Sequence, residues 1–364
     1  MNSCIDVELS IVLPAYRAER TIERAIQSAM SLASMSIEII VIDDGSDDRT
    51  GSIVSQISAT DPRVRIVSQS NKGRSAARGA GVAAARGKWT MFLDADDYLL
   101  SGASAVLADY VHDCSLDLAV FSYEQVGLAS DAASSRNEIS KNLVLSSQDV
   151  LEEMLAMPGS AGRLPGGMFE MNAVWARLYR TERLRELCIA DATGEWCPFP
   201  VGLRFSEDRL LNIAYLASGG EFAVGFCPLP VYCWDLGESQ TCGVVKPDDI
   251  SRIDLYRCYC DDLVRAYLIT KHQANCLFTL ELANQFQRAI CQCDAPLGLL
   301  LEYWKHAITG ECISHIDVSQ IKRCVSLRKW LPGLMLIKHG FVSGAFKSYR
   351  SLIGLKRASK CKRK

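Results

Sequence analysis

Short apolar runs and helical apolar patterns alternate through the first third of the chain. The apolar runs that predict strands are 9–13, 38–42, 64–67, 89–93 and 116–121. Apolar residues recur at helical spacing between them, at 21–33 and 74–86. Strands that alternate with helices form parallel sheets with helices on both faces. The pattern therefore predicts an α/β fold built on a Rossmann-like, mostly parallel sheet.

Polar residues directly follow three of these predicted strands. Tyr16 follows the first, Asp44 follows the second, and the tetrapeptide Asp94-Ala95-Asp96-Asp97 follows the fourth. Open parallel sheets bind their ligands beyond the carboxyl ends of the strands. We therefore expect these side chains to converge on one edge of the sheet.

The Asp94–Asp97 tetrapeptide has the most specific chemistry in the sequence. Three carboxylates within four residues repel one another unless a cation or hydrogen bonds offset the charge. One or two carboxylates, together with substrate phosphates, commonly hold Mg²⁺ or a similar hard cation. Such an ion neutralises a diphosphate leaving group. The alternative is a cluster that caps the next helix.

Four stretches occur together in the first 97 residues: SIVLPAYRAERTIERAIQS (10–28), EIIVIDDGSDDRT (38–50), NKGRSAARGAGVAAARGKW (71–89) and MFLDADD (91–97). In order and spacing they resemble the motifs of the inverting glycosyltransferases of family 2. The resemblance implies the nucleotide-sugar-binding fold called GT-A, with a helical C-terminal extension. It also implies transfer of a sugar from a nucleotide-diphosphate donor, with UDP favoured, to a glycan or lipid-linked acceptor in cell-surface polysaccharide biosynthesis.

The resemblance also assigns roles at the donor site. Asp44 is expected to accept a hydrogen bond from the nucleobase, and Pro14 and Tyr16 to line the base pocket, where an aromatic ring stacks favourably. Arg78 is expected to approach the base or the diphosphate. The alternatives are rim packing for Tyr16 and a solvated helix position for Arg78.

Asp94 and Asp96 correspond to the family's Asp-x-Asp pair. The resemblance makes both residues donor-binding and makes Asp96 the better ligand of a divalent Mn²⁺ or Mg²⁺ cofactor.

The segment RFSEDRLLNIAYL (204–216) resembles the family's Glu-Asp motif at the start of a helix. An inverting transfer needs a carboxylate that takes the proton of the acceptor hydroxyl. We expect Asp208 to be this base and Glu207 to orient it or replace it. Alternatively, two acids at a helix N-terminus simply favour the helix dipole.

The segment AVWARLYRTERL (173–184) resembles a Trp-x-x-Leu-Tyr helix near the acceptor. A helix over 169–187 would place Trp175 and Tyr179 on one face, since they are spaced i, i+4. Both are expected to bind the acceptor, with core packing as an equal alternative.

One motif departs from the family. The segment VYCWDLGESQTCG (231–243) keeps Tyr232, Ser239 and Thr241, but it has Trp234 and Asp235 where a basic residue often lies. A contact from this segment to the diphosphate is therefore not expected. Asp235 binds the acceptor or has no role in the site.

Three regions follow from these assignments: a donor-binding half (1–123), a half with the acceptor site and base (124–245), and a helical region with a basic tail (246–364). From residue 322 onward the chain has thirteen Lys/Arg and no Asp/Glu, interspersed with large apolar residues. This composition predicts peripheral contact with an anionic membrane. A solvated basic end is the alternative, and no module accompanies the charge to suggest nucleic-acid binding.

Cysteine usage and hydropathy predict the compartment. The fifteen Cys are scattered and include no Cys-x-x-Cys, which favours free thiols in a reducing cytoplasm. No secretory signal is recognisable at the start of the sequence. The longest uncharged apolar run has about eight residues, well short of the roughly 20 that span a bilayer. The expectation is a cytoplasmic protein, associated at most peripherally with the membrane.

Other classes of protein fit the sequence less well. A sugar nucleotidyltransferase typically carries a glycine-rich phosphate loop after its first strand, where this chain reads LPAYRAER. A glycoside hydrolase uses two carboxylates but needs no metal–diphosphate site. A catalytically inactive, membrane-associated partner protein remains open.

Overall fold

The computed structural model describes residues 7–127, 141–155, 172–187, 197–237 and 252–291, together with the single residues 299, 335, 339 and 345. The chain forms two compact units. The first comprises Met1–Met154, Gly162–Gly202 and Glu207–Cys242, and the second comprises Leu155–Ala161, Leu203–Ser206 and Gly243–Lys364.

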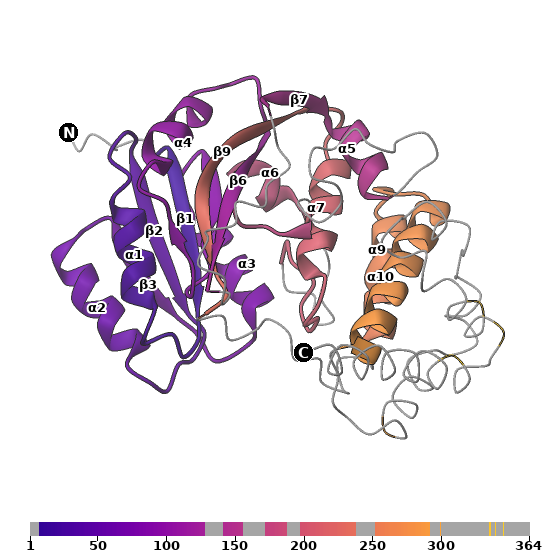
Figure 1. Cartoon of the computed structure of the whole chain (residues 1–364), viewed down its shortest axis with the longest axis horizontal. Coiled ribbons are helices and arrows are strands. Elements are labelled where there is room, and N and C mark those ends of the chain that lie inside the picture. Colours follow the sequence, from indigo (N-terminus) through magenta and orange to yellow (C-terminus); the bar gives the residue numbers. More distant parts are fainter. Residues whose placement is uncertain are drawn as a thin grey trace, which may run out of the picture. The chain divides into compact units, whose positions relative to one another are not determined.

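The first unit is built on one mixed sheet (Figure 1). Its described strands are β1 (Leu9–Ala15), β2 (Ile37–Asp43), β3 (Val64–Ser68), β4 (Trp89–Phe92), β5 (Tyr98–Leu99), β6 (Leu118–Val126), β7 (Leu143–Ser146), β8 (Arg177–Arg180) and β9 (Ala223–Asp235). They lie in the order β3-β2-β1-β4-β8-β6-β9-β5, and β7 also pairs with β9. All five predicted strands are present, so the predicted α/β fold class is confirmed.

Helices connect these strands. The described helices of this unit are α1 (Ile22–Met30), α2 (Thr50–Thr60), α3 (Arg74–Ala84), α4 (Ala103–Val111), α5 (Ser147–Met154), α6 (Thr181–Glu186) and α7 (Glu207–Ala217). Both predicted helical patterns, at 21–33 and 74–86, correspond to α1 and α3.

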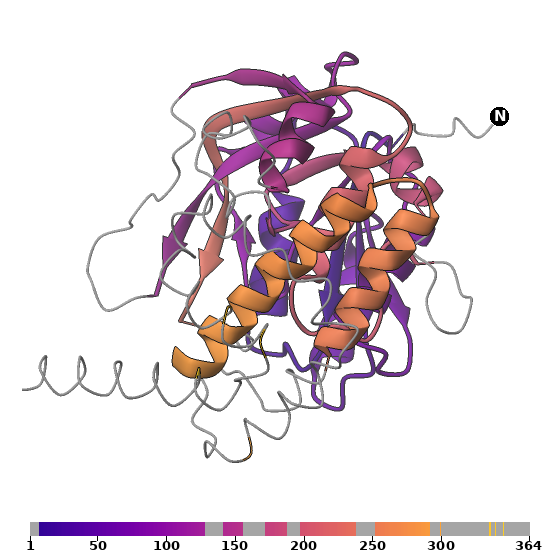
Figure 2. The ribbon, with the colours of Figure 1, turned by 90° about the vertical axis from the view of Figure 1, so that its right-hand side faces the viewer.

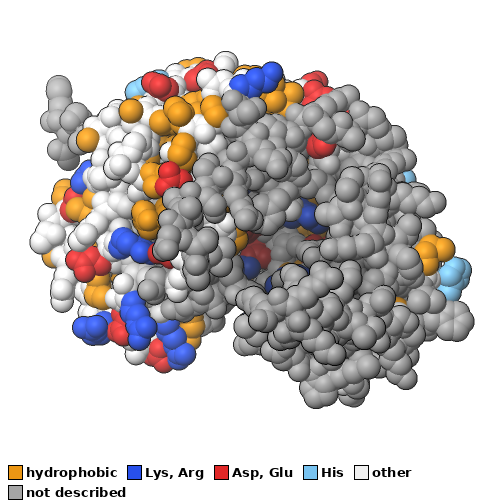
Figure 3. Space-filling model, in the orientation of Figure 1, with side chains coloured by type: hydrophobic (Ala, Val, Ile, Leu, Met, Phe, Trp, Pro, Cys, Tyr) orange, Lys and Arg blue, Asp and Glu red, His pale blue; other side chains and the backbone are white. Residues whose placement is uncertain are grey.

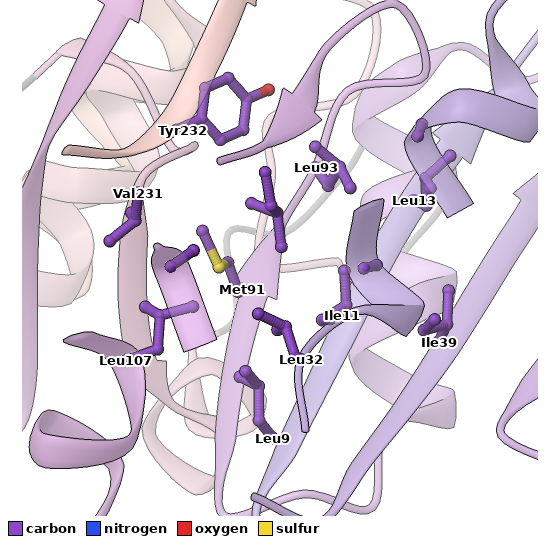
Figure 4. Packing of buried hydrophobic residues seen from close by; sticks show 14 of the residues in the cluster. Leu9, Ile11, Leu13, Leu32, Ile39, Met91, Leu93, Leu107, Val231 and Tyr232 are labelled. Atoms are coloured by element: carbon purple, nitrogen blue, oxygen red, sulfur yellow. The ribbon is translucent and has the colours of Figure 1, made fainter. Parts of the chain in front are cut away.

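The parallel strands are buried on both faces. β1 pairs in parallel with β2 and β4, and β2 pairs in parallel with β3. Ile39 and Val41 join the core cluster that contains the buried face of α1 (Figure 4). Ile40 and Ile42 pack with Ala77 of α3 instead. α1 and α3 therefore cover opposite faces, which explains why the β2 sequence is apolar at almost every position.

The sequence predicted a helix over 169–187, but residues 177–180 of this range form the strand β8. The prediction is wrong for these residues. β8 pairs antiparallel with both β4 and β6. Its residues Arg177, Leu178 and Tyr179 are buried, because both neighbours are central strands. Pairing with two buried strands overrides the local helical preference. In the described part of this segment the helix begins only at Thr181.

In the described part of the second unit, α9 (Ile253–Arg265) and α10 (Lys271–Cys291) pack against each other (Figure 2). Each has a buried apolar side, and both helices lie in the region 246–364 that was expected to be helical. Among the described helices, none combines the length and the apolar character needed to cross a membrane. The basic tail lies outside the described residues, apart from three isolated positions.

A prediction concerns Gly81, which lets α3 approach the sheet closely. A Cβ atom at this position would lie 2.2 Å from Cγ1 of Val12 in β1. We expect Gly81→Ala to lower the free energy of unfolding by about 1–3 kcal/mol through overpacking, measured by urea titration of tryptophan fluorescence. Gly102→Ala is the control, because nothing lies within 4 Å of its Cβ position. Equal urea midpoints for the two variants would contradict this account of the packing.

Candidate active site

Four separate segments meet at the carboxyl edge of the parallel strands. β1, β2 and β4 end just before Tyr16, Asp44 and Asp94. The backbone N–H of Asp44 donates to the carbonyl of Ala15 (2.9 Å), which joins the first two strand ends. An isolated bridge pairs Phe92 with Trp175 and brings that segment to the end of β4.

Asp44 organises the loop that precedes α3. Its Oδ1 accepts hydrogen bonds from Gln69 Nε2 (2.7 Å) and from the backbone N–H of Lys72 (2.8 Å). Its Oδ2 accepts one from the N–H of Gly73 (2.8 Å). Since a carboxylate offers about four acceptor positions, these bonds leave one for a ligand. Asp44 is 3% exposed, so very little of this residue faces solvent.

Pro14 lies in β1 and Tyr16 directly follows it, on either side of Ala15, whose carbonyl bonds the N–H of Asp44. Tyr16 is 42% exposed, and the guanidinium of Arg17 lies 5.2 Å from the centre of its ring. Arg17 forms a two-pronged ion pair with Asp47, at 2.6 Å for each bond. Pro14 is half-buried in β1. An exposed ring at a strand end is well suited to stacking on a base.

Arg78 of α3 bridges two carboxylates. Its Nη1 donates to Asp208 Oδ1 and its Nη2 donates to Asp94 Oδ1, both at 2.7 Å. The side chain is 2% exposed, so the alternative of a solvated helix position is wrong. Burial by itself lowers the pKa of Arg78, but the charges of Asp208 and Asp94 outweigh burial and raise it. The guanidinium therefore stays charged inside the protein.

A second arginine of α3 repeats this pairing one turn earlier. Arg74 forms an ion pair with Glu207, whose side chain is 1% exposed. The charge of Glu207 is the main reason that the pKa of Arg74 is raised. Sequence reasoning did not assign Arg74 a role. The available signal was the i, i+4 spacing of Arg74 and Arg78, which places both side chains on one face of α3. Two basic groups on one face can pair with the two adjacent acids at the start of α7.

Asp208 is set apart from Glu207 by its accessibility. Its side chain is 21% exposed and lies at the start of α7. Burial raises the pKa of Asp208 to about 6, against the opposing attraction of Arg78. At neutral pH the group is ionised, yet it takes up a proton more readily than an ordinary aspartate. These are the properties of a general base.

The three acids of the Asp94–Asp97 tetrapeptide have different environments. Asp97 is 2% exposed and accepts hydrogen bonds from the Tyr232 hydroxyl (2.6 Å) and the Asp235 N–H (2.9 Å). Burial, followed by the charges of Asp94 and Asp96, raises the pKa of Asp97 to about 8. Asp94 and Asp96 are both partly exposed. These two acids are therefore the members of the tetrapeptide that a ligand can reach.

The donor atoms present fit a divalent ion that is bound together with a diphosphate. Within the residues that the structure describes, no group of three or more His, Cys, Asp or Glu side chains could hold a metal. A hard cation needs only one or two carboxylates when substrate phosphates complete its shell. Asp94 and Asp96 can supply these ligands, with Oδ1 of Asp94 already bonded to Arg78. These residues therefore fit an ion whose ligands come partly from the protein and partly from a diphosphate, and not an ion held by protein ligands alone.

The two predicted acceptor residues are separated by the structure. Trp175 lies at the sheet edge and stacks on Tyr232, with ring centres 5.0 Å apart. Tyr179 is 0% exposed, and its hydroxyl donates to Asn212 Oδ1 (2.7 Å). The shared helical face proposed for them does not exist, since Tyr179 belongs to β8. Tyr179 packs in the core, the alternative that the sequence left open.

The segment that departs from the family also has a defined structure. Asp235 forms an ion pair with Arg24 (2.8 Å), and the ring of Trp234 lies 5.8 Å from that of Trp175. Ser239 and Thr241 lie outside the described residues.

In Figure 3, acidic and basic side chains lie next to one another on the described surface, as expected where charges are paired locally.

A prediction concerns the bridge made by Arg78. Arg78→Met leaves Asp94 and Asp208 without their shared counter-charge, so we expect the free energy of unfolding to fall by about 3 kcal/mol, measured by urea titration. Arg49→Gln is the control, since it removes an exposed ion pair with Glu19 and should leave the urea midpoint almost unchanged. An Arg78→Met protein as stable as the control would show that the bridge contributes little.

Comparison with known proteins places this geometry in context. Residues 10–172 match the model of Glycosyl transferase family 2. An uncharacterized glycosyltransferase, EpsJ of Bacillus subtilis (strain 168), is 29% identical over 210 residues, which cover 57% of this chain and 55% of EpsJ. The succinoglycan biosynthesis protein ExoO of Rhizobium meliloti (strain 1021) is 29% identical over 245 residues, covering 67% of this chain and 65% of ExoO. The chain thus matches about half to two-thirds of the length of these curated relatives.

Among solved structures, residues 1–349 of S. aureus TarS, in complex with UDP-GlcNAc, superpose with a TM-score of 0.68. The sequence identity is 17%, and the match covers 96% of this chain and 92% of that structure.

Proposed function

We propose that this chain is a family 2 glycosyltransferase with the GT-A fold, which moves a sugar from a nucleoside diphosphate donor to a hydroxyl group of a glycan or lipid-linked acceptor. The match of residues 10–172 to the family model, the two glycosyltransferase-like relatives and the superposition on TarS support the proposal. The observation that carries the proposal is the Asp94–Arg78–Asp208 bridge. The bridge joins Asp94, at the carboxyl edge of the parallel strands, to Asp208, whose carboxylate has the properties of a general base.

The donor in this proposal is a uridine diphosphate sugar. Asp44 accepts a hydrogen bond from the base through its remaining acceptor position, and Tyr16 stacks beside the base with Pro14 below it. We extend the uridine from TarS, which was solved with UDP-GlcNAc. Asp94 and Asp96 would hold a Mn²⁺ or Mg²⁺ ion, which would supply positive charge to the leaving diphosphate.

Asp208 is the base in the proposed reaction. Its carboxylate accepts the proton of the acceptor hydroxyl while the acceptor oxygen bonds to the anomeric carbon and the diphosphate leaves from the opposite side. Arg78 holds Oδ1 of Asp208 at 2.7 Å and so leaves the other oxygen to take the proton. Glu207 is held by Arg74 and is 1% exposed, which favours an orienting role for it.

The biological setting is part of the same proposal. The name of ExoO motivates a role in polysaccharide biosynthesis, and the free thiols of the described cysteines suit a reducing cytoplasm. The basic segment 322–364 is proposed to contact an anionic membrane, where a lipid-linked acceptor would lie. Sedimentation with anionic vesicles, with and without this segment, tests that contact.

A prediction tests the donor site. A panel of nucleotide sugars with Mn²⁺, scored for binding and for release of nucleoside diphosphate, should identify one preferred donor. Asp96→Ala should weaken Mn²⁺-dependent donor binding by at least about 10-fold, because it removes a proposed ligand of the ion. Formation of nucleoside triphosphate and sugar 1-phosphate when pyrophosphate is added to the nucleotide sugars would indicate a nucleotidyltransferase. A panel in which no nucleotide sugar binds would refute the proposed function.

A further prediction tests the base. Asp208→Asn should lower kcat by about 10²–10⁴-fold while donor affinity changes little. In the unsubstituted enzyme, kcat/KM should fall as the pH drops below about 6, because protonated Asp208 cannot accept a proton. Glu207→Gln is the companion variant and should keep that pH dependence. Full turnover by Asp208→Asn, or loss of the acid limb in Glu207→Gln, would reassign the base.

A further inference from the structure

A second arginine holds the Asp94–Asp97 tetrapeptide from the side of α1. We propose that Arg24 and Asp235 form a clamp that positions the Asp94 and Asp96 carboxylates for the cation–diphosphate complex. The inference rests on the proposed function. It assigns a positioning role to Arg24 and Asp235, which take no part in the proposed reaction.

Arg24 makes three contacts, one with the tetrapeptide and two with residues beside it. Its Nη2 donates to the backbone carbonyl of Asp96 (2.7 Å), one of the two acids proposed to hold the ion. Its Nη1 donates to Oδ2 of Asp235 at the end of β9 (2.8 Å). Its guanidinium also lies 4.7 Å from the centre of the Tyr98 ring. A planar guanidinium can make all three contacts at once, which a lysine cannot.

β9 completes the clamp from the other side. The N–H of Asp235 donates to Oδ1 of Asp97 (2.9 Å), and the Tyr232 hydroxyl donates to Oδ2 of Asp97 (2.6 Å). The same Tyr232 oxygen accepts the backbone N–H of Asp94 (3.2 Å). The backbone is therefore held at Asp94 by β9 and at Asp96 by α1, and the Arg24–Asp235 ion pair connects the two supports.

The burial of the pair explains why it matters to the tetrapeptide. The side chain of Asp235 is 11% exposed, and that of Arg24 is 41% exposed. Loss of Arg24 leaves a largely buried carboxylate beside the acids of the tetrapeptide, and like charges at that distance repel one another. The Asp96 carbonyl also loses a charge-assisted hydrogen bond. Both effects displace the backbone that carries the proposed ligands.

Arg63 offers a matched control for the clamp. It forms an ion pair with Asp61 (2.8 Å) and donates to the carbonyl of Met30 (3.1 Å), with side-chain exposures of 37% and 14% for the pair. This is the same combination of ion pair and carbonyl contact at similar burial. It lies just before β3, at the opposite end of the strands from the carboxyl edge.

The test uses Mn²⁺ and UDP as probes with the full chain. Calorimetric titration should show Mn²⁺-dependent UDP binding weakened by about 10-fold or more in Arg24→Gln and in Asp235→Asn, as for other residues that orient metal ligands. The double variant should bind no more weakly than the worse single variant, because both changes break one link. Arg63→Gln should bind like the unsubstituted protein. Equal weakening in Arg63→Gln, or additive losses in the double variant, would overturn the clamp.

Amide hydrogen exchange separates failure of the clamp from failure of the proposed function. If the unsubstituted protein shows no Mn²⁺-dependent UDP binding, the proposed donor site fails and the exchange data alone decide the clamp. Amides of residues 94–98 should then exchange about tenfold faster in Arg24→Gln than in Arg63→Gln, the effect of one lost charged hydrogen bond. Unchanged exchange in this segment would overturn the clamp.

Discussion

The guanidinium of Arg78, buried between Asp94 and Asp208, constrains the rest of the site. A buried charge is tolerated only when its partners remain in place, so the end of β4, the body of α3 and the start of α7 are held in one arrangement. Asp94 is 16 positions from Arg78 in the sequence, and Asp208 is 130 positions away. Arg74 extends the arrangement to Glu207. Two arginines thus face three carboxylates, and the excess negative charge suits a cationic ligand.

The sequence predicted the parallel half of the sheet well, because its strands are short, mainly apolar segments and β1, β2 and β3 are each followed by a helix. The positions of Tyr16, Asp44 and Asp94 followed from the rule that parallel strands end at one edge. β8 was missed for the opposite reason. Its four residues contain no apolar run, and their strand conformation depends on β4 and β6, which lie far away in the sequence.

The chemistry of the site was predictable in kind but not in its pairings. The sequence identified Asp208 and Glu207 as acids at a helix start, and the resemblance favoured Asp208 as the base with Glu207 to orient it or replace it. Their partners on α3 and their different burial separate them. The pair of Arg24 and Asp235, 211 positions apart, had no local signal at all. Such pairings depend on the complete fold, so a short motif cannot reveal them.

The hydrogen bonds of Asp44 have a mechanical consequence. This carboxylate accepts hydrogen bonds from the N–H groups of Lys72 and Gly73, and Gly73 is the residue directly before α3. Arg74 follows it at once and Arg78 one turn later, and these two arginines pair with Glu207 and Asp208. Asp44 therefore fixes the start of the same helical turn from which both arginines reach the acids of α7.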